Sequence, residues 1–444
     1  MADRSSVPSA PDRPGELVLR GGTVVDRTGS RRADVRVVEG TVAEVAEGIA
    51  PGPGATVLDA GGCLVTPGFV DLHTHLREPG REEAETVETG TRAAALGGYT
   101  AVVAMPNTEP ALDSAESVRN IYALAQGALA EVAVAGAITV GRAGERLAPM
   151  AELAALGVRL FTDDGDGVQS AGLMRRALQY ATDLGVTLAQ HCEDKSLAAG
   201  GVMHEGAWSS RLGLPGQPAE AEEVMVARDI ALARATGGRV HFLHLSTAGS
   251  VDLVRRARAE GVPVTAEVAP HHFTLTDACA CGFDPVFKVN PPLRTDADVA
   301  AVKAALADGT ADAIATDHAP HAPELKDLPF DQAPPGMLGL QTAFALAVTE
   351  LDLPVERIVA LLSWQPAAIA RLDAASGGVH GGDVAPGRPA NLAVVDPAAT
   401  WVVDPAALAS RSRNTPYAGR TLTGRVRHTV LAGEPVVVDA EAQR

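Results

Sequence analysis

The middle of the chain alternates between apolar strands and amphipathic helices, and this alternation restricts the possible folds more than any other feature. Helical spacing of alanine and leucine marks Glu83–Leu96, Ser170–Leu184, Ala219–Ala235 and Val251–Glu260. Strands are predicted around them at Val65–Leu72, Tyr99–Met105, Val132–Val140, Val158–Thr162, Val186–Gln190, Val240–Leu245, Val262–Val268 and Ala313–Thr316. Such a pattern indicates parallel strands with crossover helices, in either a closed (β/α)8 barrel or an open doubly wound sheet.

Side chains that bind metals gather where these strands end, and their distribution separates the two folds. They follow the first, fourth, fifth, sixth and eighth strands, as His73 and His75, Asp163 and Asp164, His191, His244, and Asp317, His318 and His321. A closed barrel brings the carboxyl ends of all these strands to one mouth, where barrel enzymes have their active sites. We therefore predict an α/β fold with a TIM-type barrel over residues 65–384.

Both flanks of the barrel contain short alternating runs separated by glycine and proline. This pattern is typical of small antiparallel sheets. We expect residues 16–64 and 385–440 to combine into one composite β-sandwich domain. Residues 1–15 lack an apolar core and are expected to form a disordered leader.

Composition excludes several classes of partner. The 444 residues are 46% apolar and 21% charged, as in a globular protein. A formal charge of -18 argues against nucleic acid and anionic membranes as partners. No apolar run reaches the roughly 18 residues of a membrane span, so a cytoplasmic location is expected. The cysteines, Cys63, Cys192, Cys279 and Cys281, show no C-x-x-C spacing and are predicted to be reduced thiols.

Four of the histidines and two of the carboxylates suffice to hold two divalent ions. We assign His73, His75 and Asp317 to one ion and His191 and His244 to the other, with Asp164 between them. Neutral imidazole and carboxylate suit zinc, and also accept cobalt or manganese. Two ions about 3.5–4 Å apart can share a nucleophilic hydroxide, which predicts hydrolysis of an amide-like bond or its reverse.

Each ligand has a structural alternative when it is considered alone. Asp163 and Asp164 could cap the turn that follows them, and His191 and His244 could be core histidines with satisfied hydrogen bonds. His241 is expected on the opposite face of its strand, in a structural role. His271 and His272 could line the pocket, although packing or solvent contact is favoured.

The ordered motifs VDLHTHLREPG, AMPNT, FTDDG, AQHCED, HLST, KVNPPLR and ATDHAPH resemble those of dihydroorotases in the amidohydrolase superfamily. The resemblance runs from about Gly61 to Ala370 and is to the bacterial type with an aspartate at the bridging position. It implies reversible cyclisation of N-carbamoyl-L-aspartate to L-dihydroorotate in de novo pyrimidine biosynthesis, by a metal-bridging hydroxide.

The resemblance also implies a role for each matching residue. Asp317 corresponds to the general acid/base, which takes the proton of the hydroxide and delivers it to the leaving nitrogen. The metal positions, for two Zn²⁺ ions, are His73, His75, Asp164, His191, His244 and Asp317. Contacts to the substrate carboxylate match Arg77, Asn107 and His321, contacts to the ring amide match Asn290, Pro335 and Gly336, and His75 is counted with the substrate contacts.

Related enzymes provide the main alternatives. Hydantoinases and allantoinases bridge their metals with a carbamylated lysine after strand four, whereas this chain has no lysine before Lys195. An aspartate-bridged enzyme for another cyclic ureide stays open. A non-catalytic scaffold for aspartate transcarbamoylase should lack ligands, and none is missing here. A metal-storage or sensing protein has no support beyond the ligands.

Two further expectations concern the surroundings of the site. Besides a small-molecule substrate, we expect a homo-oligomer, with association with aspartate transcarbamoylase left open. The segment 321–342, rich in proline and glycine, is predicted to fold over the barrel mouth and to contribute His321 and the backbone of Pro335 and Gly336.

Overall fold

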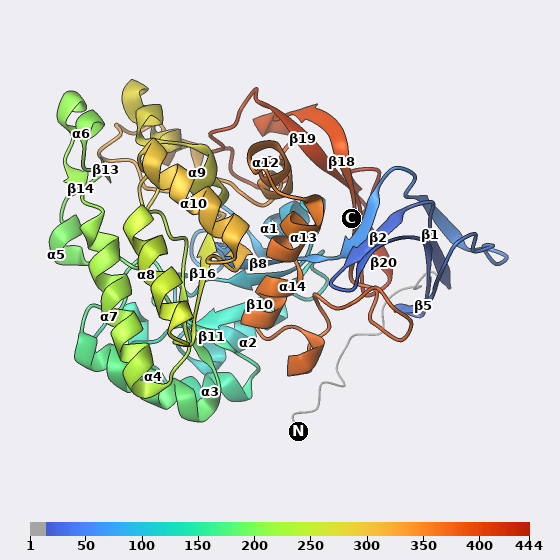
Figure 1. Cartoon of the computed structure of the whole chain (residues 1–444), viewed down its shortest axis with the longest axis horizontal. Helices are drawn as coiled ribbons and strands as arrows, with labels where there is room; N and C mark the ends of the chain where they lie inside the picture. Colours follow the sequence, from blue (N-terminus) through green and yellow to red (C-terminus); the bar gives the residue numbers. More distant parts are fainter. Residues whose placement is uncertain (1–14) are drawn as a thin grey trace.

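The computed structural model describes residues 15–444 and contains an eight-stranded barrel sheet (Figure 1). Thus the predicted leader, apart from residue 15, lies outside the described residues. Neighbouring strands pair in parallel in the order β17-β16-β15-β12-β11-β10-β9-β8. A parallel bridge between Thr74 at the end of β8 and His318, four residues after β17, connects the two edges of this sheet. The strands are β8 Phe69–Thr74, β9 Tyr99–Ala104, β10 Glu131–Gly136, β11 Leu160–Phe161, β12 Thr187–Gln190, β15 Val240–Phe242, β16 Val264–Val268 and β17 Ala313–Ile314.

All eight predicted barrel strands are present, and the first one needs correction. The segment predicted as Val65–Leu72 is two strands in different sheets, because the chain leaves β7 (Leu64–Pro67) and enters β8 at Gly68. A Cβ at Gly68 would lie 2.2 Å from the side chain of Thr100, so only glycine fits this crossing.

Helices surround the barrel, and small apolar side chains fill its interior. Helix α1 begins at Val87 rather than at the predicted Glu83, because the side chain of Thr86 accepts the N–H of Thr89 and caps it. The longer helices are α1 Val87–Leu96, α2 Ala115–Leu124, α4 Ala171–Leu184, α7 Glu220–Thr236, α8 Ala248–Ala259, α10 Asp296–Asp308, α12 Ala343–Glu350 and α13 Val355–Leu362. Shorter ones are α3 Met150–Ala155, α5 Lys195–Ala198, α6 Ala207–Leu212, α9 Pro270–Thr274, α11 Pro323–Lys326 and α14 Trp364–Ile369.

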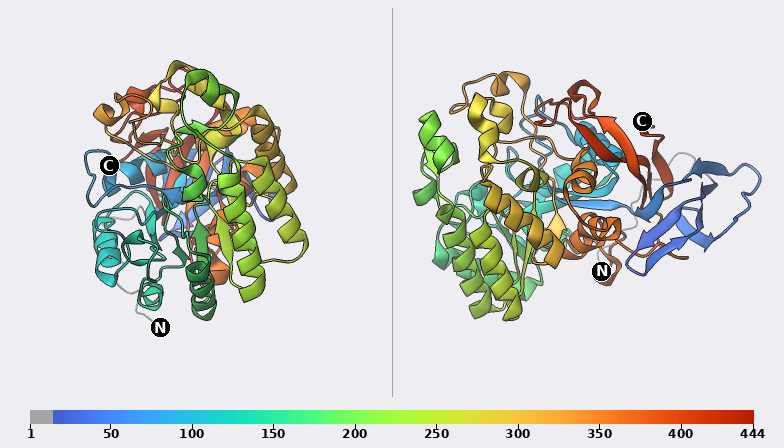
Figure 2. Two further views of the ribbon diagram at one scale, coloured as in Figure 1. Left: turned by 90° about the vertical axis from the view of Figure 1, so that its left-hand side faces the viewer. Right: turned by 45° about the horizontal axis from the view of Figure 1, so that its top comes forward.

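Strands from both ends of the chain share a seven-stranded sheet beside the barrel, where the blue and red segments meet in Figure 2. Its order is β21-β20-β19-β18-β7-β2-β3, with β2 Thr23–Asp26, β3 Gly29–Arg32, β18 Leu392–Val402, β19 Thr421–Leu431, β20 Glu434–Val438 and β21 Glu441–Ala442. A four-stranded sheet is formed by β5 Thr41–Ala46, β4 Asp34–Val38, β1 Glu16–Arg20 and β6 Thr56–Asp59. A short two-stranded sheet, β13 Met203–His204 and β14 Gly216–Gln217, lies apart from these.

These terminal sheets are mixed rather than antiparallel, which corrects the prediction. Strand β1 pairs in parallel with β6, and β2 in parallel with β7. Apolar side chains of both sheets, among them Leu17, Val35 and Val394, form a second core. The domain boundaries predicted from the sequence stay a prediction. Within residues 15–444, no helix combines the length and the apolar character that crossing a bilayer requires.

Candidate active site

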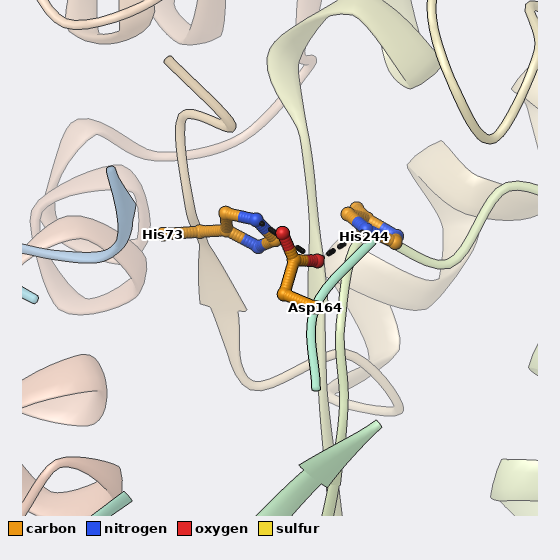
Figure 3. A group of neighbouring side chains, drawn as sticks. All are labelled: His73, Asp164 and His244. Carbon is orange, nitrogen blue, oxygen red and sulfur yellow. Dashed lines mark ion pairs between the residues drawn. The ribbon is translucent and has the colours of Figure 1, made fainter. Parts of the chain in front are cut away.

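Asp164 lies at the centre of a buried cluster formed by the ends of five barrel strands. Its Oδ1 lies 3.4 Å from His73 Nε2, 3.5 Å from His191 Nδ1 and 3.7 Å from His244 Nε2. Its Oδ2 lies 3.6 Å from His75 Nε2. Figure 3 shows the Asp164 carboxylate between the rings of His73 and His244. The two oxygens of one carboxylate therefore face different sets of imidazoles.

Asp317 completes a second group of donors beside this carboxylate. Its Oδ1 lies 3.3 Å from His75 Nε2 and 3.6 Å from His73 Nε2. Two sets of atoms are close enough to hold a metal ion, one from His73, Asp164 and His244 and one from His73, His75 and Asp317. Compared with our assignment from the sequence, His73 belongs to both sets, and His191 belongs to neither, although its Nδ1 lies 3.5 Å from Asp164 Oδ1.

The donor spacing fits divalent metal ions. Ligands about 2.1 Å from a tetrahedral ion lie about 3.4 Å apart, close to the separations found here. His73 Nε2 and Asp164 Oδ1 are buried without a hydrogen-bond partner. Buried polar atoms are seldom left unpaired, so these two atoms have the surroundings expected of metal ligands.

The second ring nitrogen of three of these histidines lies near an outer partner. His73 Nδ1 lies 3.0 Å from Glu267 Oε1, and His75 Nδ1 lies 2.9 Å from Asn107 Oδ1. His191 Nε2 lies 3.6 Å from Glu193 Oε2. An outer acceptor keeps the proton on that nitrogen and leaves the inner nitrogen free for a metal.

Three residues of the site have left-handed backbone conformations, which residues other than glycine seldom adopt. The φ angles are 62° for Arg77, 32° for His244 and 47° for Asp317. Such conformations cost roughly 1–3 kcal/mol each and concentrate at functional sites. All three residues line the cavity described below.

The cluster opens into a cavity of about 220 Å³ that brings the predicted substrate contacts together. Its lining includes His75, Arg77, Asn107, Asn290, His321, Pro335 and Gly336, together with Asp164, His191, His244 and Asp317. His73 lies beneath it, fully buried. Arg81, which the sequence did not single out, also lines the cavity.

Arg77 provides the fixed positive charge of this cavity. Burial lowers its pKa to about 10, so it remains a cation at neutral pH. Its Nε donates to the carbonyl of Pro320 at 3.1 Å. Arg77 could simply have paired with a neighbouring carboxylate, Glu78 or Glu82, but within residues 15–444 no carboxylate forms an ion pair with it. The guanidinium is available to an anionic ligand.

The segment after β17 folds over the mouth, as predicted. His321 Nε2 donates to the carbonyl of Pro335 at 2.8 Å. Asn414, from the segment between β18 and β19, donates to the carbonyls of Ala319 and Gly336 at 3.0 and 3.1 Å. No sequence motif predicted the role of Asn414, because it lies almost a hundred residues beyond the loop to which it donates hydrogen bonds.

The structure also places other residues that the sequence singled out, and one that it did not. Asp163 accepts hydrogen bonds from the N–H groups of Ile138 and Thr139 and is structural. His241 was predicted on the opposite face of its strand, which is wrong: its Nε2 lies 2.9 Å from Glu267 Oε2, and the other oxygen of Glu267 contacts His73 inside the barrel. His271 was expected to pack or meet solvent, but its Nε2 lies 3.7 Å from Asp317 Oδ2. Glu267 was overlooked in the sequence, although a charged residue inside the largely apolar strand 264–268 was a signal for it.

Comparison with known proteins identifies the family. A sequence model described as dihydro-orotase-like matches residues 62–250. A dihydroorotase of Pelotomaculum thermopropionicum is 51% identical over 431 residues, which cover 96% of this chain and 99% of the relative. The dihydroorotase of Mycobacterium tuberculosis is 49% identical over 422 residues, covering 92% and 96%. The chain belongs to the dihydroorotase family. As a member of this family, it is a cyclic amide hydrolase.

Solved structures with the same fold include hydantoinases. An L-hydantoinase from Arthrobacter aurescens superposes with a TM-score of 0.85 at 24% identity and covers 96% of this chain and 97% of its own. That likeness shows that the two chains share one barrel fold. The lysines distinguish this site from a lysine-bridged one. Lys195 pairs with Asp166, Lys303 with Glu350, and Lys288 and Lys326 with backbone carbonyls, so no lysine faces the cluster in the described chain.

Proposed function

We propose that this chain interconverts N-carbamoyl-L-aspartate and L-dihydroorotate, with two Zn²⁺ ions in the Asp164 cluster. One observation carries the proposal: a bridging carboxylate and an unpaired arginine share one 220 Å³ cavity. Arg77 and Asn107 suit the carboxylate of dihydroorotate. Hydantoin and allantoin have no carboxylate. The family relationship supports the same substrate.

The two ions, when bound, would supply an activated water near neutral pH and polarise the scissile carbonyl. The chain itself orients the ring. Arg77 presents a planar fork that suits a carboxylate, and the NH2 group of Asn107 can donate to the same group. His321 is neutral, because burial and the nearby cations Arg77 and Lys326 lower its pKa to about 2. Donation from His321 to the substrate therefore requires release of its hydrogen bond to Pro335.

Asp317 moves the proton in this proposal. Its Oδ1 faces His75 and His73, so Oδ2 is the oxygen available to take a proton from water. In ring opening, Oδ2 delivers that proton to the leaving amide nitrogen. In ring closure, it removes the proton of the ureido nitrogen.

The deciding experiment is an ultraviolet assay of ring opening by protein supplied with zinc. L-Dihydroorotate is compared with hydantoin, allantoin and dihydrouracil, the last of which is the same ring without the carboxylate. We expect a preference for dihydroorotate of at least about 100-fold in kcat/KM, since an unpaired buried arginine penalises a ring that lacks the anion. Equal rates on dihydrouracil would refute a carboxylate-binding role for Arg77. No activity on dihydroorotate would refute the proposed reaction.

The proposal extends to the cell. The reaction would belong to de novo pyrimidine biosynthesis in the cytoplasm, and the enzyme would be a homo-oligomer. Association with aspartate transcarbamoylase is part of the same proposal. Size-exclusion chromatography with light scattering, alone and with that transferase added, would test both forms of assembly.

A further inference from the structure

The two asparagines of the cavity have opposite orientations, and one of them is fixed by a metal ligand. Asn107 Oδ1 lies 2.9 Å from His75 Nδ1. When a metal ion occupies His75 Nε2, as the proposed function requires, the ring proton lies on Nδ1 and is donated to Asn107. One N–H of the Asn107 NH2 group then donates to Asp164 Oδ2 at 3.4 Å, and the other can donate to an anion in the cavity.

Asn290 is fixed in the opposite sense. Its Nδ2 lies 2.6 Å from Glu193 Oε2. A carboxylate accepts hydrogen bonds and has none to donate, so the NH2 group of Asn290 must face Glu193. Asn290 Oδ1 has no hydrogen-bond partner in the described chain and is left to accept a proton donor in the cavity that Asn290 lines.

Glu193 is itself held by neighbours on two sides. Gln217 Nε2 donates to its Oε2 at 3.1 Å, and His191 Nε2 lies 3.6 Å from the same oxygen. Burial raises the pKa of Glu193, and hydrogen bonds from His191, Asn290 and Gln217 outweigh burial, so that its pKa lies below the ordinary value. One carboxylate thus contacts both a candidate metal ligand and a substrate-facing amide.

We propose that Glu193 is a specificity-determining positioning residue, which holds the Asn290 carbonyl toward the cavity and so selects a cyclic ureide with an unsubstituted ring N–H. The inference rests on the proposed function. Asn107 offers a donor to the anionic end of the substrate, and Asn290 offers an acceptor to its N–H. Glu193 would act through Asn290 without touching the substrate.

The test exchanges the donor and the acceptor between the two side chains. In Glu193→Gln the new amide can donate or accept, so Asn290 is free to turn. We expect KM for L-dihydroorotate to rise about 10-fold, with a smaller change in kcat, because one oriented hydrogen bond to the substrate is lost. In Asn290→Asp two carboxylates meet, and the rise in KM should be larger.

The double variant Glu193→Gln/Asn290→Asp separates positioning from a general structural role. The amide introduced at position 193 can donate to one oxygen of the carboxylate introduced at position 290, and the other oxygen then accepts the ring N–H. We expect the KM of the double variant to return to within about 3-fold of wild type, because the acceptor in the cavity is restored. A structural role alone predicts that the two defects accumulate.

All assays use excess zinc, with bound metal and thermal unfolding measured for every variant. Glu152→Gln, which alters an exposed carboxylate on α3, is the matched control and should match wild type. A double variant no better than Asn290→Asp, or an unchanged KM in Glu193→Gln, would overturn the inference. Loss of metal with normal KM after reloading would also overturn it, since Glu193 would then serve His191 alone. Failure of the proposed function can be distinguished from failure of this inference, because the wild-type protein itself would then not open the ring of dihydroorotate.

Discussion

The two oxygens of Asp317 have different surroundings, so that one can bind a metal ion while the other carries a proton. Oδ1 lies near the inner nitrogens of His73 and His75, whereas Oδ2 lies 3.7 Å from His271 Nε2. Burial raises the pKa of Asp317, but the hydrogen bond from His75 and the nearby imidazoles outweigh burial and hold the pKa below its ordinary value. The carboxylate is thus ready to receive a proton on the oxygen that is not facing the ligands.

Asp317→Asn should lower kcat by about 10²- to 10⁴-fold, the range for loss of a general acid/base. An amide nitrogen cannot carry the proton between water and the leaving group. Steady-state assays with excess zinc, together with elemental analysis of bound metal, check this. A variant that keeps both metals and a tenth of the wild-type rate would contradict the role.

Glu267 acts on the other side of the same cluster. It is fully buried, accepts from His73 Nδ1 at 3.0 Å and lies 2.9 Å from His241 Nε2. Glu267→Gln should weaken metal binding about 10- to 100-fold, because a neutral amide orients and polarises His73 less strongly. Competition with a chromophoric chelator measures the affinity, and Glu152→Gln again serves as control. Unchanged affinity would make Glu267 a packing residue.

At the scale of elements, the mouth segment from Pro320 to Gly336 depends on one half-buried lysine, Lys326. Lys326 Nζ donates to the carbonyls of Pro334 at 2.8 Å and Pro285 at 3.0 Å. Burial, with help from Lys288, lowers its pKa to about 7. This amine therefore connects the mouth segment to the chain that leads into Asn290.

Lys326→Met keeps the length of the side chain and removes the donor. We expect KM to rise about 3- to 30-fold, because the half-buried carbonyls of Pro285 and Pro334 lose their donor and the segment loosens. Amide hydrogen exchange over residues 320–336 should quicken while bound zinc stays constant. Lys303→Met, which breaks an ion pair with Glu350, is the control. Wild-type KM and exchange in Lys326→Met would refute this role.

Sequence patterns predicted the barrel because its strands and helices differ in period and composition. They could not separate β7 from β8, because apolar residues continue across the crossing at Gly68. The inner side chains of the cluster were placed correctly at strand ends. The outer partners were missed because a hydrogen bond to Glu193 or from Asn414 depends on three-dimensional proximity, and neither residue has a periodic pattern around it.

At the scale of the whole molecule, both ends of the chain build the sheet beside the barrel, and the C-terminal region also reaches the barrel mouth. The segment between β18 and β19 contacts the site at two points. Ser410 donates to Glu85, which lies 3.2 Å from His318 Nε2. Asn414 Oδ1 accepts the N–H of His321 at 3.2 Å while its Nδ2 donates to two carbonyls of the mouth segment. The C-terminal region is therefore part of the substrate cavity's framework.

Graded substitution of Asn414 should show this dependence. Asn414→Asp can still accept from His321 but cannot donate to the carbonyls of Ala319 and Gly336, whereas Asn414→Ala loses all three hydrogen bonds. We expect KM to rise about 10-fold in the aspartate variant and more in the alanine variant, with bound metal unchanged, because the ligands lie deeper on the strand ends. Kinetics and metal analysis decide the matter. Loss of metal at normal KM would mean that the C-terminal segment supports the metal cluster instead of the mouth.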